Sequence, residues 1–161
     1  MDLNINNITF IIVSFKSEKV IFNCLDSLPK VSKKIIIENT QDNNLKKDLE
    51  SKYDNIEVIL NKNIGMGASN NIGIKRSQTQ FVYVLNPDVT LRKNTIENLI
   101  HSIKNIEKFA IISPINSNLD YPNHKNEKSI NENIIEVSSI DGFSMILNKQ
   151  KFKDDNFFDE N

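Results

Sequence analysis

The chain has 161 residues, the size of one ordinary domain, and it is 39% hydrophobic and 25% charged, which is a globular composition. Its net charge of −1, without a block of basic residues, argues against binding to the phosphate backbone of nucleic acids. One cysteine and two histidines exclude a disulfide framework and a zinc cluster, and no apolar run is as long as a membrane span. We therefore expect one soluble, cytoplasmic domain over residues 1–161.

Hydrophobic patterning predicts alternating strands and helices along the first two thirds of the chain. Runs of β-branched and other apolar residues predict strands over 8–15, 35–37, 56–60, 81–85 and 110–114. Apolar residues at helical spacing predict helices over 20–28, 45–52, 68–77 and 96–103. This alternation is typical of βαβ units, so the predicted fold class is α/β with a mostly parallel central sheet.

The last third of the chain has a different pattern. Residues 116–133 are polar and lack apolar periodicity, which predicts a long surface loop. Two further strands are predicted over 134–137 and 143–147, separated by Asp141 and Gly142. Neither a repeat nor a linker divides the chain into smaller units.

Polar residues lie at the carboxyl ends of four of the predicted strands, the edge where open α/β sheets bind ligands. They are Ser14 with Ser17, Glu38 with Asn39, residues 61–67, and residues 86–88. Each of them is also an ordinary turn-forming residue. Their recurrence after four strands favours a ligand site over unrelated turns.

Two of these segments have chemistry of their own. Gly65 and Gly67 precede a predicted helix, where the backbone approaches a ligand closely and free N–H groups bind an anion. Asp88 follows Asn86 by two residues, and such oxygen ligands hold a divalent cation together with substrate phosphates. The same tripeptide is also a common turn.

A dinucleotide-dependent oxidoreductase is a remote alternative. Its Gly-x-Gly-x-x-Gly fingerprint would begin at Gly65, but Asn70 stands in place of the third glycine. The segment also lies in the third predicted βα unit, whereas the fingerprint belongs to the first. An acid does follow about 20 residues later, at Asp88.

Five motifs occur in an order that resembles family 2 glycosyltransferases of the GT-A fold, especially their bacterial rhamnosyltransferase-like branch. They lie at residues 12–17, 36–40, 63–74, 85–89 and 141–145, and so extend over essentially the whole chain. The resemblance implies a three-layer Rossmann-like sandwich that is incomplete at its carboxyl end. It also implies a metal-assisted, inverting transfer of a sugar from a dTDP-rhamnose or UDP-sugar donor to a cell-surface polysaccharide or lipid-linked glycan.

The resemblance also implies roles for individual residues. Glu38 takes the place of an acid that contacts the nucleoside, where the family more often has aspartate. Asp88 matches the metal-binding acid, which would hold Mg²⁺ or Mn²⁺ at the leaving diphosphate, and Asn86 replaces the first acid of that motif. Gly142 matches a position near the sugars. The implied nucleotide-sugar-binding residues are Ser14, Ser17, Glu38, Asn63, Gly65, Asn71, Asn86, Asp88 and Gly142.

In the family, the catalytic base belongs to a Glu-Asp pair that follows a Phe-Asp-Glu segment. Residues 158–160 match that lead-in, so the base is expected beyond Asn161 and no catalytic residue is identified. An alternative hypothesis is therefore a truncated, non-catalytic module that binds a nucleotide sugar or pairs with another chain. An exposed apolar edge on an incomplete sheet would favour homo-oligomers.

Two lysine pairs bear on location. Lys33–Lys34 and Lys46–Lys47 are interpreted as solvated faces of the domain. The alternative is a basic rim for peripheral association with the inner face of the cell membrane, where lipid-linked acceptors would lie.

Overall fold

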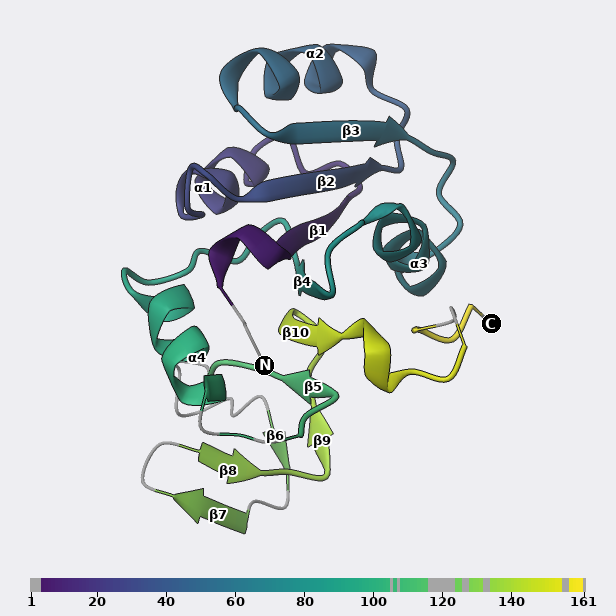
Figure 1. The fold of residues 1–161 in the computed structure, drawn as a ribbon. Coiled ribbons are helices and arrows are strands. Elements are labelled where there is room, and N and C mark those ends of the chain that lie inside the picture. Colours follow the sequence, from purple (N-terminus) through teal and green to yellow (C-terminus); the bar gives the residue numbers. More distant parts are fainter. Residues whose placement is uncertain are drawn as a thin grey trace.

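The architecture is a six-stranded sheet with helices on both faces, as the fold-class prediction requires (Figure 1). The computed structural model describes residues 4–104, 106, 108–115, 124–125, 128–131, 134–154 and 157–160. The strand order is β3-β2-β1-β4-β10-β5. The strands are β1 (Ile8–Ser14), β2 (Lys33–Glu38), β3 (Ile56–Leu60), β4 (Phe81–Leu85), β5 (Ile111–Ile112) and β10 (Ser144–Asn148).

The first four of these strands are parallel, and β10 runs antiparallel between β4 and β5. Strands β1, β4 and β10 are buried along their whole length, which explains why they read as continuous apolar runs. The connecting helices are α1 (Ile21–Asp26), α2 (Asn43–Lys52), α3 (Met66–Arg76) and α4 (Thr95–Lys104). All the strands and helices predicted over the first two thirds of the chain are confirmed, with shifted ends.

The two faces of the sheet have separate cores. Side chains of α1, α2 and α4 pack on one face, around the stacked rings of Phe10 and Tyr83. Helix α3 packs on the other face, where Ile74 joins Ile11 and Ile37. Phe157 and Phe158, near the carboxyl end of the chain, pack against this second core. The sheet is therefore covered on both faces, as a mostly parallel sheet requires.

The predicted long loop over 116–133 is wrong where the structure describes it. Two short antiparallel ribbons form there and in the following residues. The two strands within the predicted loop, at 124–125 and 128–131, are short and mostly polar, so apolar alternation does not reveal them. The strand predicted over 134–137 is confirmed as a strand over 134–136. Residues 116–123, 126–127 and 132–133 of the predicted loop lie outside the described residues. The ribbons pair β6 (His124–Lys125) with β9 (Ser139–Ile140), and β7 (Lys128–Asn131) with β8 (Ile134–Glu136).

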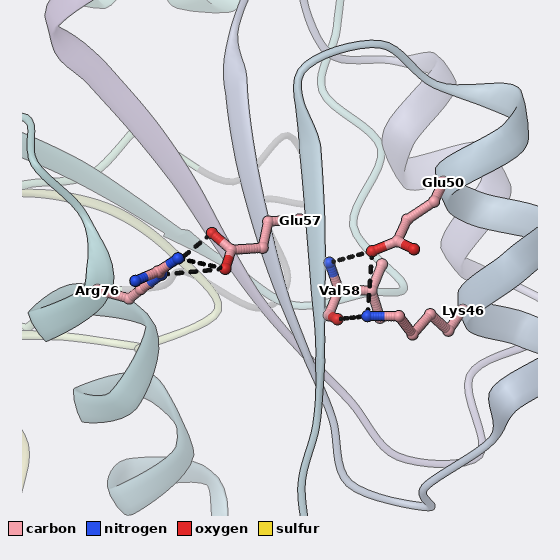
Figure 2. Close-up of polar contacts among 5 residues, drawn as sticks. All are labelled: Lys46, Glu50, Glu57, Val58 and Arg76. Carbon is pink, nitrogen blue, oxygen red and sulfur yellow. Dashed lines mark hydrogen bonds and ion pairs between the residues drawn. The ribbon is translucent and has the colours of Figure 1, made fainter.

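Strand β3 is one edge of the sheet, and side chains from two helices cover it (Figure 2). Lys46 of α2 donates to the carbonyl oxygen of Val58 at 2.5 Å, and Glu50 accepts from the Val58 amide at 3.1 Å. Lys46 and Glu50 also form an ion pair at 3.2 Å. On the other side, Arg76 of α3 pairs with Glu57 at 2.9 Å. The outward-facing peptide groups of Val58 are thus unavailable to another strand, which protects the edge from pairing.

Replacing both Lys46 and Glu50 with alanine is expected to increase self-association of the chain. The double variant uncovers Val58 at the edge, while the loss of a half-exposed ion pair lowers the free energy of unfolding by less than about 1 kcal/mol. Sedimentation velocity over a concentration series measures the effect. The matched control removes Lys47 and Asp48, two exposed charges of the same helix. Equal association of both variants would contradict a role for this pair in covering the edge.

The interpretation of Lys33–Lys34 as a solvated face is wrong for Lys34. It is 3% exposed, because it lies on the same face of β2 as Ile36, the face that α1 and α2 cover, and its ammonium donates to the carbonyl oxygen of Ser32 at 2.8 Å. Burial lowers the pKa of this ammonium. Lys33 is exposed, as predicted. Within the described part of the chain, no helix combines the length and apolar character needed to cross a membrane.

Candidate functional site

The carboxyl ends of β1, β2 and β3 lie side by side, so the predicted site residues after them share one edge of the sheet. Ser14 is in register with Glu38, and Glu38 with Leu60. The amide of Asn39 donates to the carbonyl oxygen of Ser14, and the amide of Asn61 to that of Glu38, both at 2.8 Å. The loops after these strands therefore start as a continuation of the sheet, which positions their side chains.

A polar network that sequence reasoning did not assign links these loops to α3. The side-chain amide nitrogen of Asn39 donates to the Ser69 hydroxyl at 2.9 Å. The side-chain oxygen of Asn39 accepts from the side-chain amide of Asn61 at 3.0 Å. Asn39 and Ser69 are both buried. Asn39 and Asn61 each follow one of two adjacent parallel strands, and the strand register places them side by side. Their side-chain amides were the sequence signal that could have predicted this network. The network holds the start of α3 against the ends of β2 and β3.

Glu38 is fully buried at the end of β2, and its carboxylate is used by the turn that follows. Its oxygens accept from the amides of Thr40, at 2.9 Å, and Asp42, at 3.3 Å, and from the Thr40 hydroxyl. Asp42 in turn caps α2 by accepting from two amides of its first turn. Glu38 thus shapes the loop at the site. A nucleoside that bonds the Glu38 carboxylate would do so in addition to the bonds from Thr40 and Asp42.

Ser14 and Ser17 differ in how their hydroxyls are used. Ser14 is fully buried at the end of β1, and its hydroxyl has no hydrogen-bond partner among the described residues. A buried hydroxyl without a partner costs about 1–3 kcal/mol, so it is a group that a ligand or a water could satisfy. The Ser17 hydroxyl instead bonds the amide and carbonyl of Phe15, at 3.2 and 3.3 Å. It shapes the turn before α1.

Gly65 starts α3 in a conformation that favours glycine, with φ of 92°. A side chain there would meet nothing within 4 Å, so the backbone angle and not crowding explains the glycine. Asn63 stabilises the turn by accepting from the Gly65 amide at 3.2 Å. Both residues are exposed. The amino end of α3 therefore faces solvent, with the free N–H groups and dipole that suit an anion.

The turn after β4 brings Asn86 and Asp88 next to the segment that contains Gly142. The Asn86 amide donates to the carbonyl oxygen of Phe143 at 2.8 Å, one residue beyond Gly142. The Asn86 carbonyl accepts from the Val89 amide at 3.2 Å and so closes the turn. Asp88 projects from it and is exposed. Asn86 and Phe143, which are 57 positions apart in the sequence, thus meet through the antiparallel pairing of β4 and β10.

Cys24 lies beneath this turn as a core thiol. It is fully buried in α1, and its sulfur contacts the Asn86 carbonyl oxygen at 3.6 Å. Burial, with a smaller effect from the charge of Asp88, raises the pKa of the thiol to about 12. Cys24 is therefore neutral at physiological pH and supports the turn without adding charge beneath Asp88.

Asp88 is the residue of this site with the chemistry to hold a divalent cation. The described residues contain no group of three or more acid, histidine or cysteine side chains able to bind a metal together. One exposed carboxylate fits Mg²⁺ or Mn²⁺ when the remaining ligands are waters and substrate phosphates. It does not fit a metal held by protein side chains alone.

Asn71 lies in the second turn of α3, beyond the turn at Asn63 and Gly65. Its side chain is 1% exposed and bonds the segment over residues 157–160, near the carboxyl end of the chain.

A separate hollow of about 660 Å³ lies between α4, β5 and the ribbons, and no predicted site residue lines it. The exposed amino end of α3 and the turn at Asp88 are instead open surface.

Comparisons with known proteins show what the chain is similar to in sequence. A family model described as glycosyl transferase family 2 matches residues 9–158. The low-salt glycan biosynthesis hexosyltransferase Agl10 of Haloferax volcanii is 30% identical over 115 residues, which are 68% of this chain and 36% of Agl10. The chain thus spans about a third of the length of that curated relative.

Solved structures give the same fold. Residues 1–349 of S. aureus TarS in complex with UDP match with a TM-score of 0.69 at 17% identity, over 95% of this chain and 50% of that one. Mannosyltransferase PcManGT from Pyrobaculum calidifontis, in complex with GDP-Man and Mn²⁺, matches with a TM-score of 0.66 at 9% identity, over 92% of this chain and 48% of that one. These likenesses confirm the expected GT-A architecture.

Proposed function

The chain belongs to glycosyl transferase family 2, and from that premise we propose that it binds a nucleoside diphosphate sugar and transfers the sugar to a glycan acceptor. The observation that carries this proposal is the position of Asp88. Its exposed carboxylate follows β4, beside the Gly142 segment and at the same edge of the sheet as the amino end of α3. Family membership removes the oxidoreductase alternative.

We assign the donor to the edge formed by the ends of β1 to β4. The unsatisfied hydroxyl of Ser14 and the carboxylate of Glu38 would face a nucleoside at the ends of β1 and β2. The turn at Asn63 and Gly65 would face the phosphates, since the amino end of α3 favours an anion. Asn86, Asp88 and Gly142 would face the diphosphate and the sugar. Ser17 acts through the turn that it stabilises.

A cation at Asp88 would neutralise the charge that develops on the leaving diphosphate. The protein contributes the carboxylate and a turn whose shape is set by hydrogen bonds to Phe143 and Val89. The proposed donor is a UDP-sugar or a dTDP-sugar. In support, residues 1–349 of S. aureus TarS, which share the fold, were solved in complex with UDP-GlcNAc. A polysaccharide or lipid-linked glycan is the proposed acceptor, in keeping with the name of Agl10 as a glycan biosynthesis hexosyltransferase.

We assign no catalytic base among the residues that the structure describes. An inverting transfer needs a base within hydrogen-bond reach of the acceptor hydroxyl. The Glu160 carboxylate accepts from the Asn71 amide at 2.9 Å, so it is held by the protein. A non-catalytic donor-binding module is the second candidate function, because none of the described residues is assigned as the base.

Calorimetric titration of the chain with UDP, dTDP and GDP, each with Mn²⁺ or with EDTA, tests the proposal. We expect one nucleotide to bind at least tenfold more tightly with Mn²⁺. Release of nucleotide from the matching nucleotide sugar then separates an enzyme from a binding module. A folded chain that binds none of the three nucleotides would overturn the proposal.

A further inference from the structure

The side chain of Asn71 is completely engaged by a segment more than 80 residues away. Its amide nitrogen donates to the carbonyl oxygen of Phe158 at 2.8 Å and to the Glu160 carboxylate at 2.9 Å. Its oxygen accepts from the amides of Phe157 and Phe158, at 3.1 and 3.0 Å. These four bonds use both donors and both acceptor positions of an asparagine side chain. At 1% exposure, Asn71 offers no free polar atom to a donor substrate.

Gly67, one helical turn earlier on the same face of α3, makes room for this segment. A Cβ atom at Gly67 would lie 2.4 Å from the carbonyl oxygen of Asp159 and 3.5 Å from the Cβ atom of Phe158. The backbone of residue 159 therefore lies directly on the helix. Phe152 packs edge-on against Phe157 at 5.0 Å between ring centroids, which anchors the start of the segment in the core.

These contacts form a dock, which we define as Gly67 and Asn71 of α3 together with the segment 157–160. The dock occupies the first two turns of α3, directly after the Asn63–Gly65 turn of the candidate site. Figure 1 shows the yellow carboxyl-terminal segment beside α3. The segment thus lies next to the turn at Asn63 and Gly65 along α3, and it carries the carboxylates of Asp159 and Glu160.

We propose that Asn71 is a positioning residue that fixes residues 157–160 against α3 and makes no contact with the donor. This inference rests on the proposed function, because the segment matters for transfer only if the adjoining edge binds the donor. It assigns Asn71 a different role from the donor contact that the family resemblance implies.

Asn71→Asp is the sharpest test, because it keeps the size of the side chain and replaces its donor group with oxygen. The new oxygen faces the Phe158 carbonyl and the Glu160 carboxylate, which repel it. We expect hydrogen exchange of the Phe157 and Phe158 amides to become at least tenfold faster, while affinity for UDP with Mn²⁺ changes less than threefold. Unchanged exchange in β1 and β4 shows that the sheet remains folded.

The double variant Asn71→Asp/Glu160→Gln supplies the rescue. Its glutamine amide donates to the introduced carboxylate, so one bond of the dock returns with its direction reversed. We expect at least threefold slower exchange than in Asn71→Asp, a recovery that a general loss of packing would not show. Gly67→Ala disturbs the dock independently, and Asn98→Asp is the same chemical change at an exposed position of α4.

Two results would overturn the proposal. One is unchanged exchange at Phe157 and Phe158 in Asn71→Asp. The other is a tenfold or larger loss of UDP affinity with those amides still protected, which would make Asn71 a donor contact. If the unmodified chain binds no nucleotide, the proposed function fails by itself, and the exchange measurements still decide whether the dock exists.

Discussion

Asp88→Ala is expected to abolish the dependence of nucleotide binding on the metal. The exposed carboxylate of Asp88 is the anionic ligand that the turn after β4 presents, and the diphosphate and waters would complete the coordination of the cation. Without it, affinity in Mn²⁺ should fall at least tenfold, about 1.4 kcal/mol, to the value measured in EDTA. Calorimetry with the nucleotide that binds the unmodified chain measures this change.

Asp48→Ala is the control for Asp88→Ala. It makes the same change in net charge at an exposed position of α2, beside β3 at the far side of the sheet. We expect nucleotide affinity in this variant to stay within twofold of the unmodified chain. Equal losses in both variants would indicate a general effect of charge. Full metal dependence in Asp88→Ala would place the cation elsewhere.

Elements with strong periodicity could be predicted from the sequence, because their burial is dictated locally. The continuous apolar run that forms β1 is such a case, and so is the helical spacing of α4 around Ile96, Leu99 and Ile103. Pairing partners are not local. The insertion of β10 between β4 and β5 depends on contacts between residues some 60 positions apart, such as Leu85 and Ser144.

The candidate site divides in the same way. Ser14, Glu38 and Asn86 could be placed at one edge because each lies at the carboxyl end of a strand, and the parallel register then brings them together. The dock could not be predicted, because nothing around Asn71 in the sequence indicates that its partner is the segment 157–160. Lys34 was predicted to be solvated because it is charged, but it lies on the same face of β2 as the core residue Ile36 and is buried there.

Gly73→Val is expected to lower the free energy of unfolding by about 3 kcal/mol, a large share of the 5–15 kcal/mol typical of a domain. Gly73 is buried where α3 crosses β1 and β2. A Cβ atom there would lie 2.5 Å from Cγ2 of Ile11 and 3.5 Å from Cγ1 of Ile37. Both isoleucines are central in the second core, so neither can move aside cheaply. Urea unfolding followed by circular dichroism measures the loss.

The matched control is Gly142→Val. A Cβ atom at exposed Gly142 meets only the flexible end of Met145, at 3.4 Å, so we expect a change below about 1 kcal/mol. Ile11→Ala removes the methyl group that a side chain at residue 73 would meet. The penalty of Gly73→Val should therefore be smaller in an Ile11→Ala background than in the unmodified chain, a coupling that a double-mutant cycle measures. Additive losses would contradict the direct contact, and the close approach of α3 to β1 would then not be what requires a glycine at residue 73.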